Sequence, residues 1–112
     1  MDTTTLNYSQ IIEQVLKEYA DFFESDEEVE TKLVLDKENQ HFLLVETGWQ
    51  NGYRIYGTLL HIDIIDHKVW IQHDGTEEGI ADDLVNAGIP KQHIVLAFKP
   101  LEIRPHTGFA IN

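Results

Sequence analysis

Two adjacent residues, Asn51 and Gly52, separate two stretches in which apolar and polar side chains alternate. Both residue types tolerate the positive φ angles of a type I′ turn, so this dipeptide is a strong signal for a β-hairpin. Asp66 and His67 separate a second pair of such stretches in the same way. Two tight turns in succession predict three consecutive antiparallel strands.

The chain contains five stretches whose apolar residues and flanking turns are typical of strands. They cover residues 29–36, 41–49, 53–66, 68–74 and 93–98. The tight turns also determine the register, because the residues on either side of a two-residue turn face one another. This register predicts a core face that carries Leu43, Val45, Leu60, Ile62, Ile64, Val69 and Ile71. It also predicts a mixed face, partly apolar and partly polar, that carries Phe42, Leu44, Ile55, Leu59, His61, Asp63, Trp70 and Gln72. We expect something to cover part of the mixed face.

Two further stretches have the periodicity of helices. Residues 5–23 place apolar side chains at helical spacing with charged ones opposite, as in an amphipathic helix. A second helix is expected near residues 76–87, with Asp74 or Thr76 as its N-cap. The acidic residues 24–28 are expected to form a solvated loop. The predicted fold class is α+β, with the N-terminal helix packed on a mainly antiparallel sheet of four to five strands.

The length and composition define the class of protein. A chain of 112 residues forms one domain, 1–112, around a single core. The absence of cysteine excludes disulfides, thiolate metal sites and cysteine nucleophiles. No apolar run approaches the roughly 20 residues that span a bilayer. The N-terminus lacks the features of a secretion signal, so we expect no membrane partner and a cytoplasmic location.

The charge balance bears on the class of partner. Twenty acidic residues against eight basic ones give a net charge of −12. Affinity for DNA comes largely from Lys and Arg side chains that neutralise phosphates. The charge therefore argues against an autonomous DNA-binding module. It favours either a simple role in solubility or an acidic surface for a basic partner.

A possible chemical site lies in the third predicted strand. His61 and Asp63 project from the same face, at a spacing used by metal sites with two histidines and a carboxylate. His73 and His106 are the possible third ligands, but the register places His73 on the other face, and nothing places His106. We therefore expect His61, Asp63 and Gln72 to form a hydrogen-bonded group, with no metal or other cofactor. No catalytic residues are predicted.

Aromatic residues flank the same region. Trp49 and Arg54 face one another across the first hairpin, and aromatic and arginine side chains are the usual anchors of protein interfaces. Ordinary packing is the alternative interpretation. The predicted partner-binding surface consists of Trp49, Tyr53, Arg54, Ile55, Leu59, His61, Asp63, Trp70 and Gln72. A second copy of the chain is one expected occupant, which would make a homodimer.

Several motifs together resemble one protein family. They are GW-x-x-G-x-R-x-YG from Gly48, H-x-D-I from His61, W-I-Q-x-DGTE-x-G-I-A from Trp70, L-V-x-AG-I-P-K-x-x-I-V-L-A-F from Leu84, and TGFAI from Thr107. As a set they resemble the XisI family, the fdxN element excision controlling factor proteins of cyanobacteria. The similarity extends over nearly the whole chain. At Asp66-His67, where family members tend to carry Asp-Gly, this chain departs from the pattern.

The resemblance implies a small α+β protein that helps to control excision of a DNA element by a site-specific recombinase. It also implies a companion, XisH, that resembles nuclease-fold proteins; it implies no catalytic residues. The favoured hypothesis is a non-enzymatic accessory factor that binds an XisH-like protein and meets DNA only indirectly. The alternatives are a metal-dependent enzyme centred on His61 and Asp63, and a factor that binds DNA directly.

Overall fold

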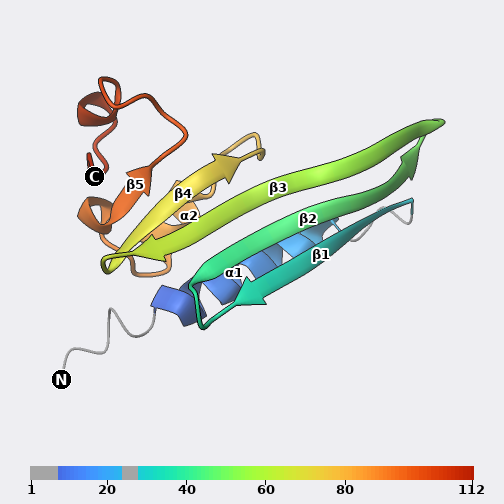
Figure 1. The fold of residues 1–112 in the computed structure, drawn as a ribbon, viewed down its shortest axis with the longest axis horizontal. Helices are drawn as coiled ribbons and strands as arrows, with labels where there is room; N and C mark the ends of the chain where they lie inside the picture. Colours follow the sequence, from blue (N-terminus) through green and yellow to red (C-terminus); the bar gives the residue numbers. More distant parts are fainter. Residues whose placement is uncertain (1–7, 24–27) are drawn as a thin grey trace.

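The structure is a computed structural model that describes residues 8–23 and 28–112. Its elements are α1 (Tyr8–Phe23), β1 (Val29–Asp36), β2 (His41–Gln50), β3 (Tyr53–Ile65), β4 (Lys68–Asp74), α2 (Ala81–Asn86), η1 (Lys91–His93), β5 (Ile94–Leu96) and η2 (Arg104–His106). The strands form one sheet in the order β1-β2-β3-β4-β5 (Figure 1). All neighbours are antiparallel except β4 and β5, which are parallel. The predicted α+β fold is confirmed; residues 5–7 and 24–27 of the expected first helix and acidic loop lie outside the described residues.

Both predicted tight turns are present. Asn51 and Gly52 have φ angles of 53° and 81°, and Asp66 and His67 have φ angles of 50° and 66°. Two successive positive φ angles define the type I′ turn that matches the twist of the flanking strands. The register next to each turn is the predicted one.

The register of β2 against β3 changes at Leu59. Val45 faces Thr58 as predicted, but Leu44 faces Leu60, so Leu59 is an extra residue in β3. An extra residue of this kind is a β-bulge, and it shifts the pairing beyond it by one position. Each β2 residue before Val45 therefore faces a different partner from the one expected.

Because of the bulge, the side chains of β2 lie on the opposite faces from those predicted. Phe42 and Leu44 are fully buried in the core, whereas Leu43 and Val45 lie on the opposite face. The prediction assigned these two pairs the other way round. A shift of one residue exchanges the faces because successive side chains of a strand point to opposite sides.

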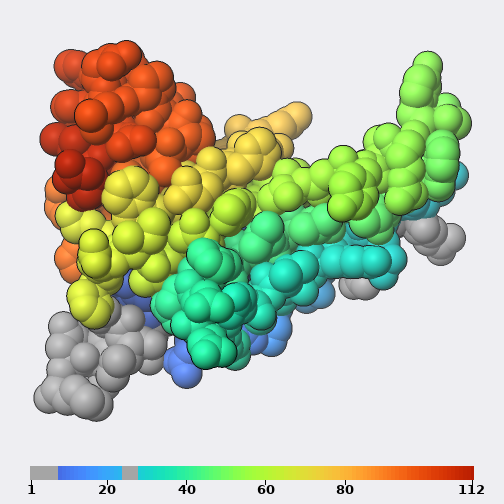
Figure 2. Space-filling view, viewed as in Figure 1, coloured from blue at the N-terminus to red at the C-terminus, as the bar shows by residue number. Residues whose placement is uncertain are grey.

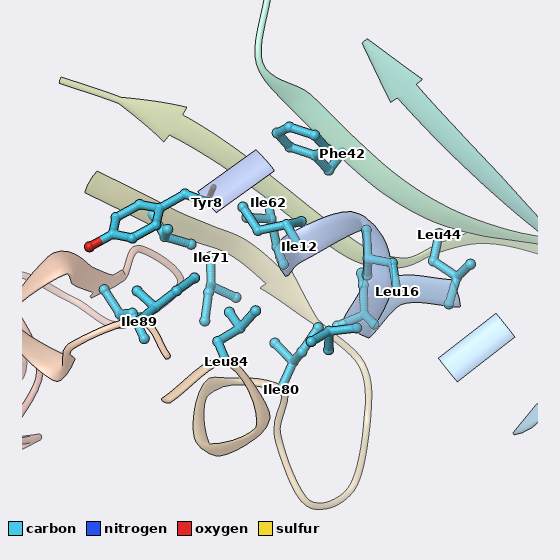
Figure 3. Packing of buried hydrophobic residues seen from close by; sticks show 14 of the residues in the cluster. Tyr8, Ile12, Leu16, Phe42, Leu44, Ile62, Ile71, Ile80, Leu84 and Ile89 are labelled. Carbon is cyan, nitrogen blue, oxygen red and sulfur yellow. The ribbon is translucent and has the colours of Figure 1, made fainter. Parts of the chain in front are cut away.

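The core lies between the sheet and the two helices, which cover the same face (Figure 3). α1 packs against β1, β2 and α2. Fully buried residues from both layers meet there, among them Ile12, Leu16, Phe42, Leu44, Ile62, Ile71, Ile80 and Leu84. The hydroxyl of Tyr8 is 2.5 Å from Nδ1 of His93, which ties the start of α1 to η1.

The second helix begins later than predicted, at Ala81. Gly79 has a φ of 86°, which a right-handed helix does not accommodate. The carboxylate of Asp74 instead holds the preceding loop, because it accepts hydrogen bonds from the backbone N–H groups of Thr76 at 2.9 Å and Ile80 at 2.8 Å. The predicted N-cap is therefore wrong: Ile80 occupies that position, and Asp74 organises the loop before the helix.

The sheet face opposite α1 and α2, which we call the open face, carries no α-helix in the described part of the chain. Figure 2 shows this face, with atoms of β1 to β4 at the surface and the β2–β3 hairpin projecting beyond the body. A short C-terminal segment adds a parallel bridge between Val95 and Ala110 beside β5. Within the described residues, no helix has the length and apolar character needed to cross a membrane.

Substitution of Gly48 in β2 tests how closely β2 packs against the chain that enters β1. A Cβ atom there would lie 2.2 Å from the carbonyl oxygen of Glu28 and 2.8 Å from Cα of Val29. We expect Gly48→Ala to lower the free energy of unfolding by about 1–3 kcal/mol, as overpacking does. Urea denaturation measures this change.

Gly57→Ala is the matched control in β3. A Cβ atom at Gly57 would meet no atom within 4 Å. Alanine is favoured over glycine inside a strand, so this change should raise the free energy of unfolding by about 0.5–1 kcal/mol. Equal effects of the two substitutions would contradict the described packing at Gly48.

Candidate functional site

A buried carboxylate lies at the centre of the open face. Asp63 of β3 is 8% exposed, and it is the one charged residue among the described residues that is buried. Its Oδ1 is 2.7 Å from Nδ1 of His41 and 3.0 Å from Nε2 of His61. Its Oδ2 accepts a hydrogen bond from the side-chain amide of Gln72 at 3.2 Å. We call these four residues the Asp63 cluster; the predicted hydrogen bonding of His61, Asp63 and Gln72 is confirmed.

Two bulges assemble the cluster. The extra residue Leu59 shifts the β2–β3 register, so that His41 faces Asp63 directly. A second irregularity lies in β4, where Gln72 is the extra residue between the partners of His61 and Ile62. Bulges redirect individual side chains in this way, and they are common beside functional sites.

The sequence analysis did not identify His41 as a site residue. Without the bulge, His41 faces Ile62 and points into the core side of the sheet. The run Phe42–Val45 is apolar at every position, so alternation in this part of the sequence does not decide which residues face the core. The available signal was that β2 begins with a histidine, His41, within one residue of the level of Asp63 in β3.

The possible metal ligands named from the sequence are only partly brought together. The ligand atoms of His41, His61 and Asp63 all lie within 4.8 Å of one another. His73 faces His61 because of the bulge, contrary to the predicted register, but it is not in this group. His106 lies in η2 and is also outside it. The third member of the group is therefore His41, which comes from β2.

The charges in the cluster support one another. Burial opposes ionisation of Asp63, but the hydrogen bonds from His41 and His61 outweigh it and hold the pKa of Asp63 below its usual value. The hydrogen bond between His41 and Asp63 also raises the pKa of His41 above its usual value. Because a carboxylate only accepts hydrogen bonds, both imidazole nitrogens act as donors here.

The predicted partner-binding residues do not all lie on one face. Leu59 packs against the core on the helix side of the sheet. Alternation along β3 places Ile55 and Tyr53 on the same side as Leu59. The bulge at Leu59 is again the reason for the difference. The other members lie on the open face: Trp49, Arg54, His61, Asp63, Trp70 and Gln72.

The aromatic residues of the first hairpin are exposed. Trp49, Tyr53 and Tyr56 are 59%, 75% and 74% exposed. We call residues 48–57 the hairpin tip. The guanidinium carbon of Arg54 lies 5.5 Å from the centre of the Trp49 ring, so the predicted stacking is confirmed.

The C-terminal segment covers one end of the open face. The Arg104 guanidinium carbon lies 5.9 Å from the centre of the Trp70 ring. The same guanidinium donates hydrogen bonds to the backbone oxygens of Ala97 and Ile111, which hold the segment together. Part of the expected cover of the mixed face is thus supplied by the chain itself.

A second surface feature was not found from the sequence. A groove of about 690 Å³ lies where the end of α1 meets the loop after β4. Its lining contains four carboxylates and three aromatic rings: Glu18, Tyr19, Phe22, Phe23, Glu77, Glu78 and Asp83. We call it the acidic groove. Its residues come from three separate segments, so no local motif marks it.

The Asp63–His41 pair predicts a pH-dependent stability. The lowered pKa of Asp63 gives stability that is present above its unfolded value of 3.8 and is lost as the pH falls through the folded pKa. The raised pKa of His41 gives stability that is present below its unfolded value of 6.5 and is lost as the pH rises through the folded pKa. The destabilisation caused by His41→Ala should therefore be greatest between these two values and smaller on either side. Urea denaturation of both proteins across this range measures it.

His106→Ala, which removes an exposed histidine outside the cluster, is the control and should follow the wild-type profile. If the effect of His41→Ala did not vary with pH, the pairing of His41 with Asp63 would be contradicted.

Comparisons with known proteins agree with this architecture. The chain matches the family described as XisI protein over residues 1–111. It is similar to a solved XisI-like protein from Anabaena variabilis ATCC 29413, with 34% identity and a TM-score of 0.88 over 96% of this chain and 99% of that one. It is also similar to the solved fdxN element excision controlling factor XisI from the same strain, with 31% identity and a TM-score of 0.83 over 97% and 99% of the two chains. No curated protein matches it. Because the family match spans almost every residue and both solved structures share the fold, this chain belongs to the XisI family.

Proposed function

We propose that this protein is a non-enzymatic accessory factor in the control of DNA element excision, and that it acts by binding an XisH-like, nuclease-fold protein. Family membership supports the biological role, since one similar solved protein is described as an fdxN element excision controlling factor. The surface of the protein supports the mode of action.

The hairpin tip is the observation that carries the proposal. The β2–β3 hairpin projects from the body (Figures 1 and 2). Trp49, Tyr53 and Tyr56 at its tip are exposed to solvent. Large aromatic side chains are costly to leave in water and are the usual anchors of protein interfaces. Arg54, stacked on Trp49, adds a planar cation that pairs with a partner carboxylate.

The charge distribution indicates the character of the partner. A net charge of −12 repels nucleic acid and attracts a basic surface. The acidic groove adds a local feature of the same kind, with carboxylates beside aromatic rings that accept a Lys or Arg side chain. A nuclease-like partner exposes a basic DNA cleft, and this protein shields or positions that cleft with its acidic surface.

Binding measurements with the purified XisH-like protein from the same host test the proposal. We expect a complex at low salt that weakens as salt is added. Trp49→Ala should weaken it by at least about 30-fold, the effect of losing an interface anchor. Because Trp49 is 59% exposed, the same change should alter the free energy of unfolding by only about 0.5 kcal/mol.

Phe98→Ala is the matched control, because Phe98 is another exposed aromatic residue, 43% exposed, outside the hairpin tip. It should leave the affinity unchanged. The absence of a complex at micromolar concentration and low salt would contradict the proposal. Tight, salt-dependent binding to DNA in a mobility-shift titration would favour the direct DNA-binding alternative. A dimer in light scattering that Trp49→Ala dissociates would favour a second copy as the occupant of the hairpin tip.

A further inference from the structure

The three donors of the Asp63 cluster are distributed unevenly over its two carboxylate oxygens. Two imidazole nitrogens, from His41 in β2 and His61 in β3, converge on the same oxygen of Asp63. The other oxygen, Oδ2, accepts a hydrogen bond from Gln72. We propose that His41 Nδ1, His61 Nε2 and the Asp63 carboxylate form a binding site for a divalent transition-metal ion, with Zn²⁺ as the first candidate.

The donor set has the chemistry of such a site. Two imidazoles and one carboxylate bind Zn²⁺, Fe²⁺, Co²⁺ and Ni²⁺, whereas Mg²⁺ and Ca²⁺ prefer oxygen donors alone. Each histidine coordinates through the nitrogen that now points at Asp63. Because these nitrogens now donate to Asp63, each ring proton must move to the other nitrogen when the metal binds, and an imidazolium releases one proton to solvent.

The distances require only small movements. All three ligand atoms lie within 4.8 Å of one another. In a tetrahedral site with bonds of about 2.1 Å, ligand atoms lie about 3.4 Å apart. His41 and His61 therefore move away from Asp63 Oδ1 by less than about 1 Å, from starting separations of 2.7 and 3.0 Å. The two imidazole nitrogens, at most 4.8 Å apart, approach one another by at most about 1.4 Å.

The surroundings already hold the carboxylate in place. Gln72 binds Oδ2, which leaves Oδ1 directed at the two imidazoles. Carboxylates that bind metals are usually oriented by such a second hydrogen bond. Adjacent strands fix the relative positions of His41 and Asp63, because these residues face one another in the ladder.

The cluster is accessible from solvent. The side chains of His41 and His61 are 49% and 34% exposed, whereas that of Asp63 is 12% exposed. An ion thus enters from the open face, and its further coordination positions remain available to water or to a group from a partner. The net charge of −12 raises the local concentration of cations.

Trp70 provides an optical probe, because it faces Asp63 directly across β3 and β4. In a Trp49→Phe background it is the remaining tryptophan. We expect Co²⁺ to bind with one ion per chain, to quench Trp70 fluorescence, and to develop the visible absorption of a site with nitrogen and oxygen ligands. Zn²⁺ should displace it and restore the fluorescence, and titration calorimetry with Zn²⁺ alone should give the same stoichiometry.

Substitutions separate a metal site from a hydrogen-bonded cluster. His41→Ala and His61→Ala should each weaken Zn²⁺ binding by at least about 100-fold, and Gln72→Ala by about tenfold, as removal of an orienting group does. His73→Ala, which removes an exposed histidine of β4 outside the cluster, should leave the affinity unchanged. Circular dichroism confirms that each variant is folded.

The proposal fails if the wild-type chain binds no Zn²⁺ or Co²⁺ at micromolar concentration. It also fails if His41→Ala and His73→Ala bind the ions equally, because the binding then resides elsewhere. A cluster that only satisfies Asp63 would lose stability in His41→Ala without any change in metal affinity. The result does not depend on the partner proposed above, since these measurements use the isolated protein.

Discussion

The extra residue at Leu59 is the constraint on which the arrangement of the sheet depends. Between the turn and Val45, β2 and β3 pair in the predicted register. From Leu44 back to His41 the pairing is shifted by one residue. On one side of the sheet this shift delivers Phe42 and Leu44 to the helices. On the other side it brings His41 opposite Asp63. The same irregularity therefore completes both the core and the Asp63 cluster, so the two are coupled through a single backbone feature.

Asp63 shows how a charge is retained on a sheet face that no α-helix covers among the described residues. A buried carboxylate without partners costs several kcal/mol, and stable proteins avoid it. Here neighbouring strands provide three donors, from His41, His61 and Gln72, and their side chains cover the carboxylate in place of a helix. The open face is thereby divided into a polar centre at the Asp63 cluster and an aromatic arm at the hairpin tip.

Much of this fold was predictable from the sequence, for identifiable physical reasons. Tight turns depend on two local residues, so Asn51-Gly52 and the register beside it were predicted correctly. A bulge depends on competition between whole strands, and the uniformly apolar run at 42–45 does not reveal it. His41 was missed for that reason. The start of α2 was misplaced because Asp74 was predicted as a possible N-cap, whereas its carboxylate holds the loop that precedes Ile80. The positive φ of Gly79, which keeps the helix from starting earlier, was not predicted.

The short bridge between Val95 and Ala110 has a consequence for solubility. It occupies the outer side of β5, so within residues 8–23 and 28–112 the long backbone edge without a neighbouring strand is that of β1. β1 carries Glu30 and Lys32 at exposed positions, and charged side chains on an edge strand hinder pairing with another chain. A protein with exposed aromatic rings at the hairpin tip is thereby less prone to fibril-like stacking along its strands.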